Sequence, residues 1–489
     1  MLLHHVAGGL NLPEGADALD ITGMTADSRA VKPGFLFAAL KGAKADGAAF
    51  AGKAVAAGAA AVLASGETAA RLRAELPGGT VVLEADDPRR ALALMAARFY
   101  GRQPKVMVAV TGTSGKTSVA DFVRQIFQAA GHSSASIGTL GTVTADGQSY
   151  GGLTTPDPVA LQAELARLEE VGITHAAMEA SSHGLDQHRL DGVRLVAAGF
   201  TNLGRDHMDY HPTVEDYLEA KMKLFRGLLP EGGVAVYDPG EKYTGRIADI
   251  AKERGLRTFT VGETGQDLRL VGLKTDGASQ ILTIAAARGE YTVSLPLLGR
   301  FQVSNALVAA GLAIAAGVNT GTALRALESL KGAPGRLEFV GRKANGGLAV
   351  VDYAHKPDAL DNVLAALRPF AKGKLSVIVG AGGDRDPGKR LLMGEIAAKR
   401  ADLVIVTDDN PRSEDPATIR KAVLAGAPEA LEIGDRAEAI REGVRRLGPD
   451  DILCVAGKGH ETGQIVKDTV LPFSDHEAVA QALAGEGQE

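Results

Sequence analysis

Short, almost uninterrupted apolar runs recur along this chain, and most of them lead directly into a glycine-rich or charged segment. They include VMVAVT from Val106, LVAAGF from Leu195, LSVIV from Leu375 and ILCVA from Ile452. Strands that are apolar on both faces are typical of parallel sheets covered by helices. In open α/β sheets, ligands bind beyond the carboxyl ends of the strands. The pattern therefore predicts an α/β protein with mostly parallel sheets and with binding sites at the sheet edges.

Two interruptions divide this pattern, as expected for a chain of 489 residues, which is too long for one hydrophobic core. The first is YGRQPK, and the second is LKGAPGRLEFV, where Pro334 and Gly335 break the alternation of strands and helices. We predict three α/β domains, at residues 1–102, 103–334 and 335–489. The first is a small unit of Ala-rich helices and short strands, and the other two are built on parallel sheets.

Composition excludes several kinds of partner and location. The formal charge of −6 and the pI near 6.0 leave no basic surface of the kind that binds nucleic acid. The one cysteine, Cys454, cannot form an internal disulfide and suits a reducing compartment. The N-terminus lacks the pattern of a signal peptide, and the longest apolar run, from Ala306, is too short for a membrane span. We expect a cytoplasmic monomer with no nucleic-acid partner and no membrane insertion.

One segment, VAVTGTSGKTS, predicts a phosphate-binding site, because a strand is followed by a Gly/Ser/Thr loop with a lysine and then by a helix. Gly112 and Gly115 let backbone N–H groups turn toward a phosphate, and Lys116 offers a positive charge to its outer oxygens. The hydroxyl of Thr117 is suited to Mg²⁺. The usual P-loop has a glycine where this chain has Val110, so the loop is a shortened variant.

A TGTxGKT loop after a strand resembles the ATP loop of the Mur ligase and folylpolyglutamate synthetase superfamily. The resemblance covers nearly the whole chain, from the DSR motif in the first domain to GKGHE in the third. It implies a UDP-binding α/β domain, a central P-loop ATPase-like domain with a mostly parallel sheet, and a Rossmann-like C-terminal domain that binds an amino acid. It also implies an ATP-dependent, amide-forming ligase.

The resemblance assigns residues to ATP and to a metal site. Besides the loop, it implies Arg336 of PGRLE for the phosphates, Asn305 for the adenine side and Asp352 for the ribose, with Tyr353 and His355 beside it. The ATP-binding residues so implied are Gly112, Thr113, Ser114, Gly115, Lys116, Thr117, Asn305, Arg336 and Asp352. Those implied for Mg²⁺ are Thr117, Glu179, His207 and Lys221, the last as a carbamate formed with CO₂. The catalytic residues implied are Lys116, Lys221, His207 and Arg336.

The first two domains resemble those of family members that bind UDP-N-acetylmuramoyl-L-alanyl-D-glutamate. The DSR motif implies a uridine contact, with the neighbouring lysine loop beside the diphosphate, and GLTTPDP and SSHGLDQHR imply contacts with the muramoyl-dipeptide. The residues expected at this substrate are Ser28, Lys44, Thr154, Thr155, Ser181, Gln187 and Arg189.

The DDNPR segment resembles the recognition motif of family members that add meso-diaminopimelate. This amino acid differs from lysine by a second carboxylate, which the planar guanidinium of Arg412 can hold through paired hydrogen bonds. The carboxylate of Glu461 suits an ammonium group. The residues expected at diaminopimelate are Arg385, Asp409, Asn410, Pro411, Arg412, Gly457 and Glu461.

The family mechanism implied for this chain has two steps. ATP phosphorylates the D-glutamyl γ-carboxylate to an acyl phosphate, with Lys116, Arg336 and Mg²⁺ stabilising the transferring group, and the amine then attacks the acyl carbon. Two alternatives remain open. The lysine-adding ligase of the same family is disfavoured by Arg412, and a regulatory P-loop NTPase gives no role to the DNPR and TTPDP segments.

Overall fold

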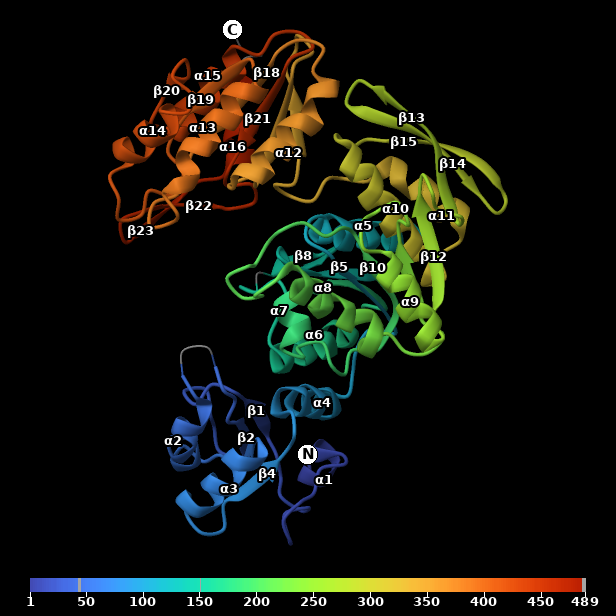
Figure 1. The fold of residues 1–489 in the computed structure, drawn as a ribbon, viewed down its shortest axis with the longest axis vertical. Coiled ribbons are helices and arrows are strands. Elements are labelled where there is room, and N and C mark those ends of the chain that lie inside the picture. The colour runs from blue at the N-terminus through green and yellow to red at the C-terminus, as the bar shows by residue number, and fades with distance from the viewer. Residues whose placement is uncertain (43–44, 150, 486–489) are drawn as a thin grey trace. The chain divides into compact units, whose positions relative to one another are not determined.

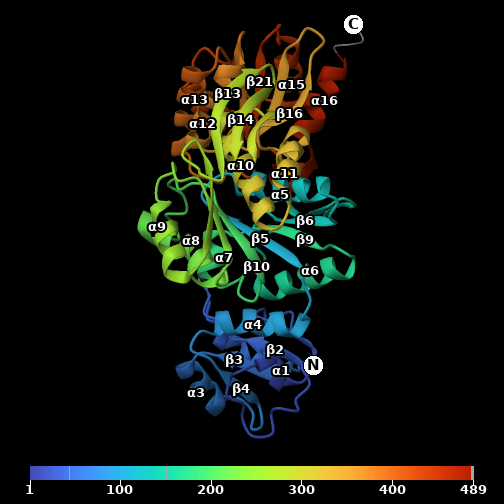
Figure 2. The ribbon, with the colours of Figure 1, turned by 90° about the vertical axis from the view of Figure 1, so that its right-hand side faces the viewer.

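The computed structural model of this chain describes residues 1–42, 45–149 and 151–485 (Figures 1 and 2). It divides into two compact units, one formed by Met1–Thr260 with Gly311–Asn319 and the other by Val261–Ala310 with Thr320–Glu489. Within the described ranges, no helix combines the length and the apolarity that crossing a membrane requires.

The first unit begins with a small parallel sheet in the order β1-β2-β3-β4, covered on both faces. Its strands are β1 (Gly23–Thr25), β2 (Phe35–Ala38), β3 (Ala61–Ala64) and β4 (Val81–Glu84). Helices α1 (Leu3–Ala7) and α4 (Pro88–Tyr100) pack on one face, and α2 (Ala51–Ala56) and α3 (Gly66–Glu75) on the other. Alternate residues of each strand enter the two cores, which is why these strands are apolar throughout.

A larger sheet follows in the same unit, with five neighbouring parallel strands in the order β11-β10-β5-β9-β6. The first four residues of β12 pair in parallel with β11, and β7 and β8 extend the other edge in antiparallel pairing. The strands are β5 (Val106–Thr111), β6 (Ser134–Gly138), β7 (Gly141–Thr144), β8 (Gly147–Ser149), β9 (His175–Glu179), β10 (Leu195–Phe200), β11 (Val234–Tyr237) and β12 (Arg257–Gly262). The prediction of a mostly parallel central sheet is confirmed.

Helices of this sheet begin at recognisable capping residues. Asp157 caps α6 with proline at the first helical position, and Thr213 and Asp216 form a capping box at α8. The helices are α5 (Lys116–Ala129), α6 (Pro158–Glu170), α7 (Ser182–Asp186), α8 (Val214–Lys223), followed by a π-helical turn at Leu224–Leu228, and α9 (Gly245–Arg254). Because β5 lies between β9 and β10, the segments that follow these three strands meet at one sheet edge.

The second unit opens with an antiparallel meander that the strand pattern did not lead us to expect. Its strands are β13 (Leu268–Asp276), β14 (Ser279–Ala286) and β15 (Gly289–Leu295). Every second residue of β14 is buried, as in a sheet with one exposed face, so these strands lack the continuous apolar character of the parallel ones. Helices α10 (Arg300–Ala315) and α11 (Thr320–Ala326) and a 3₁₀ turn (Leu327–Ser329) follow.

The C-terminal sheet has the order β16-β17-β21-β18-β19-β20, with only β16 antiparallel to its neighbour. Its strands are β16 (Glu338–Arg342), β17 (Leu348–Asp352), β18 (Leu375–Val379), β19 (Leu403–Val406), β20 (Leu431–Glu432) and β21 (Ile452–Ala456), and a hairpin of β22 (Gly463–Val466) and β23 (Thr469–Pro472) follows. Helices α12 (Pro357–Leu367), α13 (Gly388–Arg400) and α14 (Pro416–Leu424) cover one face, and α15 (Arg436–Arg445) and α16 (Asp475–Gly485) the other (Figure 1). The segments after β21, β18 and β19 therefore share one edge.

The predicted domain boundaries lie outside helices and strands. The first, after residue 102, falls between α4 and β5, and the second, after residue 334, falls between the Leu327–Ser329 turn and β16. They stay predictions.

Candidate active site

The loop between β5 and α5 has the backbone conformation expected for phosphate binding. Gly115 adopts the left-handed conformation at the N-cap of α5, and Gly112 has a φ of 147°. A Cβ atom on Gly112 would overlap the hydroxyl of Thr201, so only glycine fits there. Lys116 Nζ donates to the carbonyl oxygens of Gly112 and Thr113, at 2.9 and 2.8 Å. The lysine thus lies over the loop at the start of the helix.

Two residues beyond β10 hold this loop, and the sequence motifs did not single them out. Asn202 accepts hydrogen bonds from the backbone N–H groups of Thr113 and Ser114, through its carbonyl and side-chain oxygens respectively. Thr201 Oγ1 donates to the carbonyl oxygen of Ser114 at 2.6 Å. The available signal was their place at the carboxyl end of a strand next to β5.

Lys221 is buried against the same loop, with 1% of its surface exposed. Its Nζ donates to the carbonyl oxygen of Gly112 at 2.7 Å and lies 4.1 Å from the ring centre of Tyr217. Burial, together with the positive charge of Lys116, holds the pKa of Lys221 well below its ordinary value. A lysine in a polar helical segment such as DYLEAKMKLF is ordinarily an exposed helix lysine. The fold instead gives it the environment of a neutral amine.

The residues predicted for Mg²⁺ lie around this loop, but they do not form a preassembled metal cluster. Thr117 and Glu179 line one small pocket beside β6. Glu179 is buried, and its Oε1 accepts from the backbone N–H of Thr139 at 2.7 Å. His207 has a φ of 55°, and its ring lies 6.1 Å from that of Tyr217. Among the described residues, no group of three or more His, Cys, Asp or Glu side chains is placed to hold a metal.

The five residues predicted for the muramoyl-dipeptide in the central part of the chain form one hydrogen-bonded network. Thr155 Oγ1 lies 2.9 Å from Ser181 Oγ, and the Thr155 carbonyl accepts from Arg189 Nη1 at 2.7 Å. Arg189 also donates to Gln187 Oε1 at 2.8 Å. The hydroxyl oxygens of Thr154 and Thr139 lie 3.1 Å apart, so Thr154 contacts the network through Thr139. Glu179 connects the two parts of the network, because Thr139 Oγ1 donates to its Oε2 and Thr155 Oγ1 donates to its carbonyl oxygen at 2.9 Å. The network therefore borders the pocket of Thr117 and Glu179.

The two residues predicted for the uridine and the diphosphate, Ser28 and Lys44, belong by sequence to the first predicted domain and not to the central one. Ser28 is half-buried in a turn after β1, between the exposed Asp27 and Arg29, which form an ion pair with one another at 2.8 Å. Lys44 lies outside the described residues. Within the part of the chain that the structure describes, Ser28 makes no hydrogen bond to the central network.

In the second unit, the residues predicted for adenine and phosphate are connected by a residue that the motifs did not single out. Gln302 on α10 donates to the carbonyl oxygen of Arg336 at 3.2 Å and accepts from Asn305 Nδ2 at 2.9 Å. The guanidinium of Arg336 lies 4.8 Å from the ring centre of Tyr353. Its Nε is buried and has no hydrogen-bond partner among the described residues.

Asp352, predicted for the ribose, is buried at the end of β17. Its two carboxylate oxygens accept backbone N–H groups of Leu337 and Ala354, at 2.7 and 2.8 Å. Burial raises the pKa of Asp352 to about 6, although these bonds and the charge of Arg336 oppose the shift. Each oxygen keeps a second lone pair, so a ribose contact stays a prediction.

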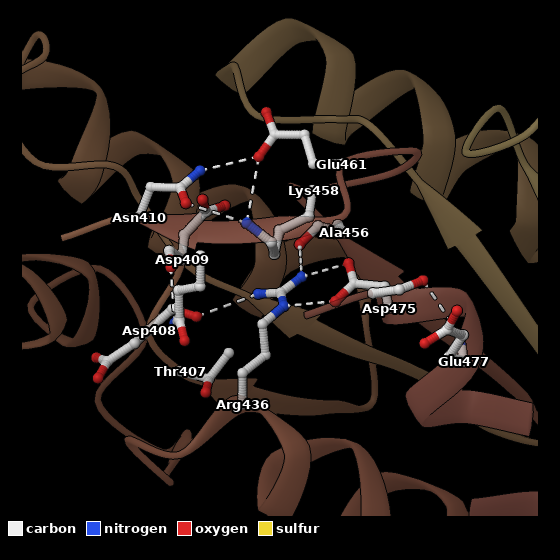
Figure 3. Close-up of polar contacts among 12 residues, drawn as sticks. Thr407, Asp408, Asp409, Asn410, Arg436, Ala456, Lys458, Glu461, Asp475 and Glu477 are labelled. Carbon is white, nitrogen blue, oxygen red and sulfur yellow. Dashed lines mark hydrogen bonds and ion pairs between the residues drawn. The ribbon is translucent and has the colours of Figure 1, made fainter. Parts of the chain in front are cut away.

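The segments after β19 and β21 bring four residues predicted for diaminopimelate together (Figure 3). Asn410 Nδ2 donates to Glu461 Oε2 at 2.9 Å, and Lys458 Nζ contacts both side chains. Gly457 has a φ of 124°, and a Cβ on it would lie 2.6 Å from Asp409 Oδ2. Asp409 and Asn410 are both buried. Pro411 is also buried, next to Asn410.

Arg412 is half-buried and held by the backbone of the adjoining loop. Its Nη1 donates to the carbonyl oxygens of Gly383 and Asn410, at 2.9 and 3.4 Å, and its φ is 51°. Arg385 comes from the same loop after β18, but it is exposed, and its Nη1 donates to the carbonyl of Asp384. Of the two predicted arginines, only Arg412 is fixed by contacts with both loops.

Comparison with known proteins supports one family along the chain. The Mur ligase family catalytic domain matches residues 20–100, the Mur ligase middle domain matches residues 110–313, and the Mur ligase glutamate ligase domain matches residues 335–459. The chain belongs to the Mur ligase family.

This Mur ligase has similar curated relatives over its full length. A UDP-N-acetylmuramoyl-L-alanyl-D-glutamate–2,6-diaminopimelate ligase of Agrobacterium fabrum is 58% identical over 467 residues, which cover 96% of this chain and 94% of the relative. A ligase of the same name from Mesorhizobium japonicum is 56% identical over 484 residues, 99% of either chain.

Solved structures agree with the assignment of this chain to the Mur ligase family. One of a UDP-N-acetylmuramoyl-L-alanyl-D-glutamate–2,6-diaminopimelate ligase superposes with a TM-score of 0.77 at 32% identity, covering 100% of this chain and 99% of the other. A MurF ligase of Thermotoga maritima in complex with ADP, 19% identical with a TM-score of 0.59 over 96% and 98% of the two chains, shares the fold.

The residues of this Mur ligase fit the groups that the family implies. Gly112 and Gly115 shape a loop that backbone N–H groups can line, and the buried, unpartnered Nε of Arg336 is suited to an anionic oxygen. Burial and the charge of Lys116 lower the pKa of Lys221, which favours the neutral amine to which CO₂ adds. The hydroxyl of Thr117, the carboxylate of Glu179 and an imidazole are ligands that Mg²⁺ accepts beside phosphate oxygens.

Proposed function

We propose that this protein is an ATP-dependent ligase that joins meso-2,6-diaminopimelate to the D-glutamyl γ-carboxylate of UDP-N-acetylmuramoyl-L-alanyl-D-glutamate, a step of peptidoglycan precursor synthesis. The observation that carries the proposal is that relatives named for this reaction are 55–58% identical to the chain over nearly its full length. A cytoplasmic location and a monomeric state stay predictions from the sequence.

The edge of the C-terminal sheet supports the identity of the amino acid. Arg412, held by two backbone carbonyls, supplies a guanidinium for the carboxylate that distinguishes diaminopimelate from lysine. Glu461 supplies a carboxylate for an ammonium group, and Asn410 is bonded to it. Opposite charges on neighbouring loops suit a substrate that carries both carboxylate and ammonium groups.

The reaction needs positioning and charge stabilisation from this chain, and no side-chain nucleophile. A γ-carboxylate oxygen of the dipeptide attacks the γ-phosphorus of ATP, and ADP leaves with the electrons of the broken P–O bond. The neutral amine nitrogen then attacks the acyl carbon, inorganic phosphate leaves with the electrons of the broken C–O bond, and the nitrogen releases a proton to solvent. The family resemblance assigns Lys116 and Arg336 to the charge on the transferring phosphoryl group, and the network of Thr155, Ser181 and Arg189 is suited to orient the dipeptide.

The metal is assigned to the region around the phosphate loop. Thr117, Glu179 and His207 would hold Mg²⁺, which supplies positive charge to the phosphate oxygens when bound. Lys221, once carbamylated, would carry a negative charge at a position where its ammonium form is disfavoured. We assign His207 as a metal ligand and not as a general base, because the attack of the carboxylate oxygen on the γ-phosphorus has no proton to remove.

The test is phosphate release from ATP and Mg²⁺ in the presence of UDP-N-acetylmuramoyl-L-alanyl-D-glutamate, with meso-diaminopimelate, with L-lysine or with no amine. We expect phosphate and UDP-tripeptide only with meso-diaminopimelate. Activity with lysine would overturn the role of Arg412 and leave the ligase chemistry intact. Phosphate release that needs neither amine nor dipeptide would instead support a regulatory NTPase.

A further inference from the structure

Lys458 is a completely buried cation directly behind the predicted amino-acid site. It follows Gly457 at the carboxyl end of β21, and its side chain is 0% exposed. Its Nζ donates to Asn410 Oδ1 at 3.1 Å and to Glu461 Oε2 at 3.2 Å (Figure 3). A buried ammonium is tolerated only when it is paired and hydrogen-bonded. Both partners of Lys458 are residues that we assign to the amino acid.

These contacts determine which way the amide of Asn410 points. Its Oδ1 accepts from Lys458 Nζ and also from the backbone N–H of Ile465, at 2.8 Å. An amide nitrogen cannot accept either bond, so the oxygen must face these two donors. The amide nitrogen is thereby directed to Glu461 Oε2, to which it donates at 2.9 Å.

The same contacts fix the carboxylate of Glu461. Lys458 and Asn410 both donate to Oε2, and Oε1 takes part in neither bond. The Glu461 side chain is 35% exposed, whereas that of Lys458 is fully covered. The lysine therefore holds the carboxylate from its buried side, and an ammonium group can approach from the exposed side.

A second buried cation nearby, Arg436, is neutralised in a different way. Arg436 is paired in bidentate fashion with Asp475, at 2.6 and 2.7 Å, and it donates to the carbonyl oxygen of Ala456 at 3.0 Å (Figure 3). Arg436 thus has a dedicated partner, Asp475, which is as buried as itself. Lys458 differs because its anionic partner is Glu461, a predicted substrate contact.

We propose that Lys458 is a positioning residue for the amino-acid substrate: it orients Asn410 and Glu461 so that Glu461 Oε1 faces the substrate ammonium. This inference rests on the proposed function. Without the lysine cation, the Asn410 amide loses one of its two orienting donors, and the Glu461 carboxylate loses its buried counter-charge. Substrate binding would then have to order both side chains, at a cost in affinity.

The inference is tested by steady-state kinetics of Lys458→Met, which keeps the chain length and removes the cation. We expect the KM for meso-diaminopimelate to rise about tenfold or more, as for the loss of one charged contact, while the KM values for ATP and the UDP-dipeptide stay within about twofold. The control is Leu364→Ala, which shortens a fully buried side chain in the core of the same sheet and leaves Lys458, Asn410 and Glu461 unchanged. This variant should change all three KM values to the same extent.

Lys458→Arg provides a second variant in case Lys458→Met does not fold. It keeps the buried charge, but its planar guanidinium cannot place one nitrogen between both acceptors, so the same selective rise in KM is expected, to a smaller extent. Equal changes in all three KM values, as in Leu364→Ala, or no change at all, would overturn the inference. An unmodified protein that is inactive with every amine would overturn the proposed function itself, and this inference with it.

Discussion

Lys221 Nζ and the carbonyl oxygen of Gly112 are joined by a 2.7 Å hydrogen bond between residues 109 positions apart in the chain. The bond attaches helix α8 to the phosphate loop. It also places a buried amine with a lowered pKa next to the backbone on which ATP is expected to bind. A change at either residue should therefore affect the loop directly.

Lys221→Met should abolish ligase activity without unfolding the protein. Methionine fills similar space and removes a buried polar amine, so we expect the melting temperature to be kept or raised. The loss of the carbamate proposed at Lys221 removes a negative charge from the metal site, which should lower kcat by about 100-fold or more. Lys252→Met, at an exposed position of α9, is the matched control. Retained activity in Lys221→Met would remove this residue from the catalytic set.

The carbamate can be observed separately from activity. A ¹³C NMR spectrum of the protein in ¹³C-bicarbonate should contain a carbamate signal that is missing in Lys221→Met. A spectrum without this signal in the unmodified protein would leave Lys221 as a neutral amine.

Gly112→Ala should inactivate the protein, whereas Gly172→Ala should not. Both glycines have a positive φ, of 147° and 85°, so alanine is strained at either position, by about 1–2 kcal/mol. At Gly112 the new Cβ would also overlap the hydroxyl of Thr201. At Gly172 no heavy atom lies within 4 Å of the position of a Cβ. ATP binding measured by calorimetry should be lost in Gly112→Ala alone. Equal effects in both variants would indicate that backbone strain, and not loop shape, decides.

Arg412→Lys should impair the use of diaminopimelate far more than that of ATP. Lysine keeps the charge but cannot bond two backbone carbonyls and a carboxylate in one plane. We expect the KM for meso-diaminopimelate to rise roughly tenfold or more, equivalent to at least about 1.4 kcal/mol. Arg441→Lys, at an exposed ion pair on α15, should leave all three KM values unchanged. An equal rise for ATP in Arg412→Lys would count against the assigned role.

Asp352 should make the stability of the second unit depend on pH. Its pKa is raised to about 6 in the folded protein, against about 3.9 in an unfolded chain. Between these values the folded state binds more protons than the unfolded state, so the free energy of unfolding falls as pH rises from about 4 to about 6. The loss amounts to about 3 kcal/mol.

This dependence can be measured by following the melting temperature of the protein and of Asp352→Asn from about pH 4 to about pH 7. The melting temperature of Asp352→Asn should lack the fall that titration of this carboxyl causes. The curves of melting temperature against pH for the variant and the unmodified protein should therefore converge or cross as pH rises. Asp450→Asn, at an exposed position, should run parallel to the unmodified protein. Parallel curves for Asp352→Asn as well would show that its carboxyl titrates normally.

Residues at the ends of parallel strands were the most predictable part of this structure. Asn410 and Glu461 follow β19 and β21, and both strands pair with or lie next to β18, so their approach follows from sheet order alone. The antiparallel meander was missed because β14 alternates buried and half-buried residues, which is a weaker signal than a continuous apolar run. Its hairpin turns at Gly277 and Gly289 were the available signal.

Burial of charged side chains was the least predictable part. Lys221 and Lys223 are two residues apart in one helix and look alike in sequence, yet the first is buried and the second bonds Asp186 at the surface. Helical spacing held the clue, since Lys221 lies four residues after the buried Tyr217. For Lys458 no such periodicity exists, because its burial depends on side chains from two loops that only the folded sheet brings together.

The pairing of Arg436 with Asp475 also bears on the order in which this protein becomes functional during synthesis. Arg436 reaches the carbonyl oxygens of Asp408 and Ala456, each one residue before a predicted contact with the amino acid, but its own counter-charge comes from the start of α16. While the ribosome still holds the segment around Asp475, the arginine beneath the site lacks its anion. The pocket for the amino acid therefore lacks this support until the segment around Asp475 has emerged, which happens after the phosphate loop has emerged.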